Sequence, residues 1–150
     1  MGYGSLDSLT QSPPNSLRLK PEQWHQMRAD VSRRAPEEAC GLVAGRDNIG
    51  VEVIPVTNAL HSPVRYRMDP NEQLEAFNRI EELGLEIVAI YHSHPSGPSY
   101  PSPTDVGEAF YPEAVYLIWF GSTHGWDCRG FLIREAEVEE IRIEKEAYEP

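Results

Sequence analysis

Residues 87–105 have the sequence IVAIYHSHPSGPSYPSPTD. Residues 87–90 form a continuous apolar run, and residues 115–120 form another further along the chain. Such runs are typical of strands that are covered on both faces of a sheet. Residues 95–103 contain four prolines and a glycine, which exclude regular secondary structure. The segment therefore predicts a buried strand that ends at a rigid loop.

Two helical patterns precede this strand in the sequence. Pro21 suits the first turn of a helix, and Trp24, Met27 and Val31 share one helical face that ends before Pro36. A second helix is predicted with Asp69 as N-cap and Pro70 in the first turn. Its expected buried face and stop are Leu74, Phe77, Ile80, Leu83 and then Gly84.

Shorter strand signals occupy most of the remaining chain. They are residues 17–19, a hairpin of 40–46 and 50–57 across Asp47-Asn48, residues 65–68, residues 127–134, and a strand or short helix at 138–143. Because helical patterns alternate with buried strands, an α/β layered domain around a mixed sheet is expected.

Length and charge limit the possible classes of protein. The 150 residues fit one domain, expected at 17–150 after a Gly/Ser/Pro-rich disordered leader at 1–16. The net charge of −11 argues against nucleic acid as a partner. There is no membrane-spanning run and no secretory signal pattern. Two cysteines do not make a disulfide framework, so a cytoplasmic location is expected.

His92 and His94 are spaced to share one metal ion. Residues i and i+2 of a strand point to the same face, about 7 Å apart along the strand. Two imidazoles at the end of the predicted strand can therefore converge on a metal at an opening of the fold. Either histidine could instead be an ordinary polar residue, which is also what we expect of His25, His61 and His124.

Asp105 is the expected third ligand. Ser102, Pro103 and Asp105 have the pattern of a helix start, with Ser at the N-cap and an acid at N3. Two histidine nitrogens and one carboxylate suit zinc and leave a fourth position for water, which is the catalytic arrangement. On this pattern alone, Ser102 and Asp105 could form nothing more than a capping box.

Glu38 is the candidate general acid/base. Zinc lowers the pKa of bound water to about 7, but a carboxylate must still take the proton and pass it on. Glu38 lies just before the predicted strand 40–46, which can neighbour the histidine-bearing strand. Taken alone, Glu38 could be a solvated acid, while Cys40 and Cys128 suit small buried apolar roles better than metal ligation.

Together these residues resemble the JAMM (MPN-plus) metalloproteases. The family signature is His-x-His-Pro, then a Ser and an Asp at fixed spacing, with a Glu three residues before a Gly upstream. Its counterparts here are the segment His92-Ser93-His94-Pro95, Ser102, Asp105, and Glu38 with Gly41. Weaker similarity extends from about Leu17 to Ile143.

The resemblance implies a deaminase-like, three-layer α/β/α fold around a mixed sheet. It implies one zinc ion held by His92, His94 and Asp105, with Glu38 as general acid/base and Ser102 donating to the oxyanion. It also implies hydrolysis of a peptide or isopeptide bond after the C-terminal Gly-Gly tail of a ubiquitin-like or sulfur-carrier protein. Only 45 residues follow Asp105, as in the short prokaryotic members.

Two other functions remain open on the sequence. Metal-free scaffold members of the family are binding modules, although they lack the ligands that this chain has. RadC-like proteins share a His-x-His-Pro-Ser-Gly segment and have a suggested link to DNA, against which the net charge of −11 speaks. The oligomeric state is not predicted.

Overall fold

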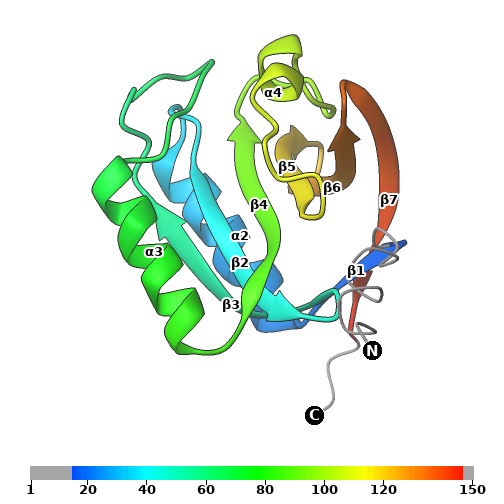
Figure 1. The fold of residues 1–150 in the computed structure, drawn as a ribbon. Helices are drawn as coiled ribbons and strands as arrows, with labels where there is room; N and C mark the ends of the chain where they lie inside the picture. The colour runs from blue at the N-terminus through cyan, green and yellow to red at the C-terminus, as the bar shows by residue number, and fades with distance from the viewer. Residues whose placement is uncertain (1–14, 147–150) are drawn as a thin grey trace.

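The computed structural model describes residues 15–146 of the chain, so nearly all of the predicted leader lies outside the described residues. Within this range, seven strands and three helices build the fold (Figure 1). The strands are β1 (Ser16–Leu19), β2 (Cys40–Arg46), β3 (Ile49–Val56), β4 (Glu86–His94), β5 (Val115–Ser122), β6 (Gly125–Arg134) and β7 (Glu137–Lys145). The helices are α2 (Pro21–Arg34), α3 (Pro70–Glu82) and α4 (Pro103–Gly107).

The strands close into a mixed barrel in the order β1-β3-β2-β4-β5-β6-β7. The short strand β1 makes the closure, because it pairs in parallel with β7 from Ser16 to Leu19 and touches β3 through Arg18 and Ile49. The expected three-layer α/β/α domain is therefore wrong. In the part of the chain that the structure describes, only α2 and α3 exceed two turns, and the residues from 115 to 145 form strands instead of a helical layer.

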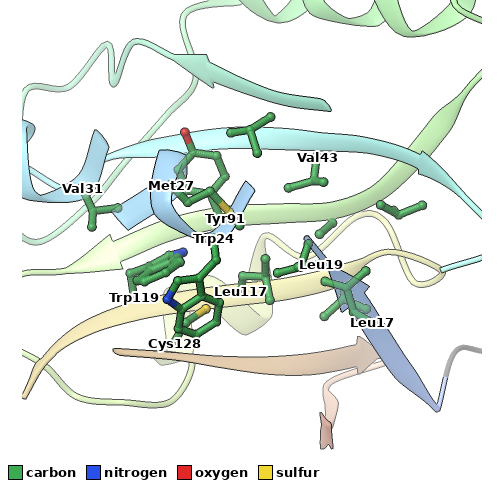
Figure 2. Packing of buried hydrophobic residues seen from close by; sticks show 14 of the residues in the cluster. Leu17, Leu19, Trp24, Met27, Val31, Val43, Tyr91, Leu117, Trp119 and Cys128 are labelled. Atoms are coloured by element: carbon green, nitrogen blue, oxygen red, sulfur yellow. The ribbon is translucent and has the colours of Figure 1, made fainter. Parts of the chain in front are cut away.

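Helix α2 packs against one face of the strands. Its residues Trp24, Met27 and Val31 are buried as the periodicity predicts. They meet Tyr91 of β4 and Trp119 of β5 (Figure 2). The helix thereby fills the side of the sheet that also receives Leu17 and Leu19 from β1.

Helix α3 covers the opposite face, and its contacts differ from the prediction. Asp69 is the N-cap as expected, accepting from the amides of Asn71 and Glu72, and Gly84 follows the helix with φ of 66°. The buried positions, however, are Ala76 and Ile80, with Phe77 partly covered. Leu74 and Leu83 are exposed, because the face of α3 that packs on β3 and β4 does not extend to these two side chains.

Two further local predictions can be compared with the structure. The hairpin between β2 and β3 is confirmed, and Asp47 and Asn48 both have positive φ, as its tight turn requires. The strand expected at 65–68 is wrong: this segment makes one isolated bridge, between Asn58 and Met68. Among residues 15–146, no helix is long and apolar enough to span a bilayer.

Arg34 fixes the start of β2 relative to α2. Its guanidinium donates to the carbonyl oxygens of Val56 and Cys40, each at 2.7 Å, and forms an ion pair with Asp30 at 2.9 Å. Asp30 is 4% exposed and also accepts from the Tyr91 hydroxyl at 2.7 Å. This network holds α2, β2 and β4 together where β2 begins, two residues after Glu38.

Candidate metal centre

His92 and His94 lie at the C-terminal end of β4, as expected from their spacing. Both rings are almost fully buried, and their Nε2 atoms are 3.1 Å apart. Ser93, between them, points the other way and accepts from the backbone amide of Ala39 at 2.7 Å. The strand alternation therefore turns two imidazoles toward one point, where β4 approaches α4 (Figure 1).

Asp105 brings a carboxylate oxygen to the same point. Its Oδ2 lies 3.1 Å from Nε2 of His92 and 3.0 Å from Nε2 of His94. The predicted capping box is present: the amide of Asp105 donates to Ser102 Oγ at 3.0 Å, and the amide of Ser102 donates to Asp105 Oδ2 at 2.9 Å. The helix start thus orients the carboxylate toward the histidines.

The three converging atoms are suited to a cation. Nδ1 of His94 lies 2.7 Å from the carbonyl oxygen of Pro98, so Nδ1 carries the proton and Nε2 presents a lone pair in the neutral ring. Two zinc ligands at a tetrahedral angle lie about 3.3 Å apart. The separations of 3.0–3.1 Å among the three atoms are close to that value, so these residues fit a zinc ion.

The pKa directions agree with a ligand set. Burial lowers the pKa of His92 and favours its neutral, metal-binding form. Although burial opposes it, hydrogen bonds from the two histidines hold the pKa of Asp105 well below its usual range. For His94, the hydrogen bonds to Asp105 and Pro98 outweigh burial and raise the pKa. A metal ion bound at this centre would therefore compete with a proton on His94.

Glu38 is the remaining carboxylate of the centre. It is 4% exposed, and a carboxylate oxygen lies within 4.8 Å of a ring nitrogen of both His92 and His94. Burial raises the pKa of this carboxyl group to about 7, while the nearby His94 opposes the rise. By distance Glu38 could also ligate a metal, but Asp105 lies closer to both histidines. A carboxylate with a pKa near neutrality is suited to move a proton.

The close approach of β2 and β4 brings Glu38 to the histidines. Gly41 faces Tyr91 in the register, and a Cβ on Gly41 would lie 2.3 Å from the Tyr91 ring. A larger residue at position 41 would push the strands apart or displace the ring. Packing against the Tyr91 ring therefore explains the glycine at position 41 of the sequence motif, without any contact between Gly41 and a ligand.

The other sequence candidates stay outside the centre. His25, His61 and His124 are exposed. Both cysteines are free and buried, and burial raises the pKa of Cys40 to about 12 and that of Cys128 well above its usual value. Cys40 Sγ is directed at the carbonyl oxygen of Val56 at 3.4 Å, away from a ligand role.

Two neighbours of the histidines were not predicted. The Tyr66 ring stacks on His92 with centroids 4.6 Å apart, in a segment that has no regular structure. The backbone carbonyl of Pro98 orients His94. Because every residue has such a carbonyl, the residue type at position 98 could not predict this contact. Nδ1 of His92 has no hydrogen-bond partner among residues 15–146.

The chain is similar in sequence and in fold to known proteins. The chain is 44% identical over 113 residues to the probable TtuB-protein conjugate cleaving protease of Thermus thermophilus, covering 75% of this chain and 72% of that protein. It is 37% identical over 127 residues to the CysO-cysteine peptidase of Mycobacterium tuberculosis, covering 83% and 87%. A solution structure of a protein from Desulfitobacterium hafniense aligns with a TM-score of 0.79 at 34% identity, covering 88% and 94%.

The sequence profile of one family spans most of the described chain. It matches residues 20–134, a range that contains Glu38, both histidines and Asp105. The chain therefore belongs to the prokaryotic homologs of the JAB domain.

Proposed function

We propose that this protein is a zinc-dependent peptidase that hydrolyses a peptide or isopeptide bond after the C-terminal tail of a ubiquitin-like or sulfur-carrier protein. One observation carries the proposal: three lone-pair atoms of His92, His94 and Asp105 lie 3.0–3.1 Å apart, beside a buried Glu38. The two relatives support the substrate class, since their names describe cleavage of a protein conjugate and of a CysO-cysteine bond.

The proposed division of labour assigns each side chain one task. His92, His94 and Asp105 would hold the zinc ion, which when bound acidifies a water molecule and polarises the scissile carbonyl. Glu38 accepts the proton from the attacking water and returns it to the leaving amine. Its pKa of about 7 allows both steps near neutral pH.

Ser102 can serve the reaction while it caps α4. Its oxygen accepts from the Asp105 amide at 3.0 Å, and this uses a lone pair and leaves the hydroxyl hydrogen free. That hydrogen is assigned to the oxyanion that develops on the scissile carbonyl. Capping and catalysis therefore do not compete for the same part of the hydroxyl.

A cleavage screen tests the proposal. Ubiquitin and several ubiquitin-like sulfur carriers, each extended after Gly-Gly by cysteine or by a lysine-linked peptide, are incubated with the zinc-loaded protein. We expect release of the extension from at least one carrier, and its loss after chelation. No cleavage of any carrier by protein containing stoichiometric zinc would contradict the proposed activity.

A further inference from the structure

Asn58 lies between β3 and α3, and both polar atoms of its side chain are hydrogen-bonded. It is 2% exposed, and its Nδ2 donates to the carbonyl oxygens of Glu38 and Arg65, each at 3.0 Å. Its Oδ1 accepts from the amides of Leu60 at 3.0 Å and Arg67 at 3.1 Å. Carbonyl oxygens surround Nδ2 of the side-chain amide, and backbone N–H groups surround Oδ1. A flipped side-chain amide would leave these donors and acceptors unpaired.

The backbone of Glu38 and Ala39 is held on all four of its polar groups. The Glu38 amide donates to the carbonyl of Ser62 at 2.9 Å, and the Glu38 carbonyl accepts from Asn58. The Ala39 amide donates to Ser93 Oγ at 2.7 Å, and the Ala39 carbonyl accepts from the Ser93 amide at 3.0 Å. We call these four hydrogen bonds the clamp. Two of them come from Ser93 of β4, and two come from the segment that contains Asn58 and Ser62.

The two bonds on Glu38 both depend on Asn58. Glu38 precedes β2, so no sheet ladder fixes its backbone. One bond comes directly from Asn58, and the other goes to Ser62, inside the loop that the Asn58 side chain closes by bonding Leu60, Arg65 and Arg67. Loss of the side-chain nitrogen Nδ2 of Asn58 would therefore leave the Glu38 carbonyl oxygen without this hydrogen bond. It would also loosen the loop whose Ser62 carbonyl accepts from the Glu38 backbone N–H.

We propose that Asn58 is a positioning residue for Glu38, holding the carboxylate of the proton carrier at its working distance from the zinc ligands. This inference rests on the proposed function, in which Glu38 moves the proton. Asn58 acts through the Glu38 backbone, and none of its hydrogen bonds goes to His92, His94 or Asp105. Its effect is thus expected on turnover and not on substrate affinity or zinc content.

Asn58→Asp is the most informative variant. It keeps the Oδ1 acceptor for Leu60 and Arg67 but replaces the nitrogen donor by an oxygen that faces carbonyl oxygens. We expect kcat to fall about 10- to 100-fold, since a small misplacement of a catalytic group has an effect of this size, with KM changed less than about twofold. Zinc content should remain one per chain.

Two further variants separate positioning from simple loss of stability. Asn58→Ser is small enough for the site but too short to reach the Glu38 carbonyl, and it should show the same fall in kcat. Ile133→Val removes one methylene from the core beside β6, which leaves a small void and lowers the stability of the fold slightly. Per folded, zinc-loaded molecule, its kcat should match that of the unmodified protein.

Amide hydrogen exchange gives a readout that does not depend on activity. In the unmodified protein the amides of Glu38 and Ala39 should exchange slowly, and in Asn58→Asp the Glu38 amide should exchange at least about tenfold faster than amides in β6. Fast exchange at Glu38 in the unmodified protein, or unchanged kcat in a folded Asn58 variant, would overturn the inference. Failure of the unmodified zinc enzyme to cleave any carrier would refute the proposed activity instead, and exchange would still test the clamp.

Discussion

The backbone amide of Ser102 donates to Oδ2 of Asp105 at 2.9 Å, and the same oxygen faces Nε2 of both histidines. A capping box that begins a one-turn helix is therefore also the support of a candidate metal ligand. Because the donor is a backbone amide, this support survives replacement of the Ser102 side chain. The hydroxyl and the backbone of Ser102 can thus be tested separately.

Replacing Ser102 by Ala should slow turnover by about 10²–10³ if the hydroxyl donates to the oxyanion. Zinc content should stay at one per chain, because the bond from the Ser102 amide to Asp105 remains. Ser102→Thr keeps a hydroxyl and should retain most of the activity. An unchanged kcat in Ser102→Ala, measured with the same carrier substrate, would leave the residue with its capping role alone.

The pH dependence of kcat/KM should show an acidic limb that belongs to Glu38. Burial raises the pKa of its carboxyl group to about 7, so the carboxylate that accepts a proton disappears as the pH falls below that value. We expect kcat/KM to rise with pH and to level off near or above neutrality. A bound zinc ion favours the ionised carboxylate, so it would shift this limb toward lower pH. A rate that is highest near pH 5 and declines toward 7 would contradict this assignment.

Gly41→Ala should destabilise the fold through Tyr91. The added Cβ would lie 2.3 Å from the Tyr91 ring, so overpacking of about 1–3 kcal/mol is expected in the free energy of unfolding. Gly107→Ala is the matched control, because a Cβ there meets nothing within 4 Å and the φ angle is not positive. Urea denaturation measures both. Equal stability of the two variants would mean that the Tyr91 ring moves aside freely.

Both cysteine thiols should be inert in the native protein. Burial raises the pKa of Cys40 to about 12 and that of Cys128 well above its usual value, so almost no thiolate is present at pH 8. Iodoacetamide should add to neither thiol without denaturant and to both in guanidinium, as intact mass will show. Rapid native labelling of Cys40 would indicate that the start of β2 opens far more often than its burial implies.

The sequence predicted the histidine part of the centre because it depends on local geometry. Alternation within one strand turns His92 and His94 to one side, and a Ser-Pro-x-Asp helix start places Asp105 on a short element. These are relations between neighbours along the chain, which spacing encodes. The structure brings all three together with Glu38, while their roles in binding and catalysis remain predictions for experiment.

The remaining features depend on contacts between distant segments. Closure of the barrel needs β1 to pair with both β3 and β7, and four residues at 16–19 carry no signal for two partners. The proximity of Glu38 to β4 depends on the register of Gly41 with Tyr91. Asn58 lies in a polar segment where an asparagine is unremarkable. Its hydrogen bonds to Glu38, Leu60, Arg65 and Arg67 appear only in the folded chain.

Zinc content and cleavage, measured on the same preparations of Glu38→Gln and Asp105→Ala, test the central claim most directly. If His92, His94 and Asp105 hold zinc and Glu38 carries the proton, Glu38→Gln will keep one zinc per chain and lose hydrolysis. Asp105→Ala will lose both metal and hydrolysis. Loss of zinc from Glu38→Gln, or retention of cleavage by it, would contradict the account.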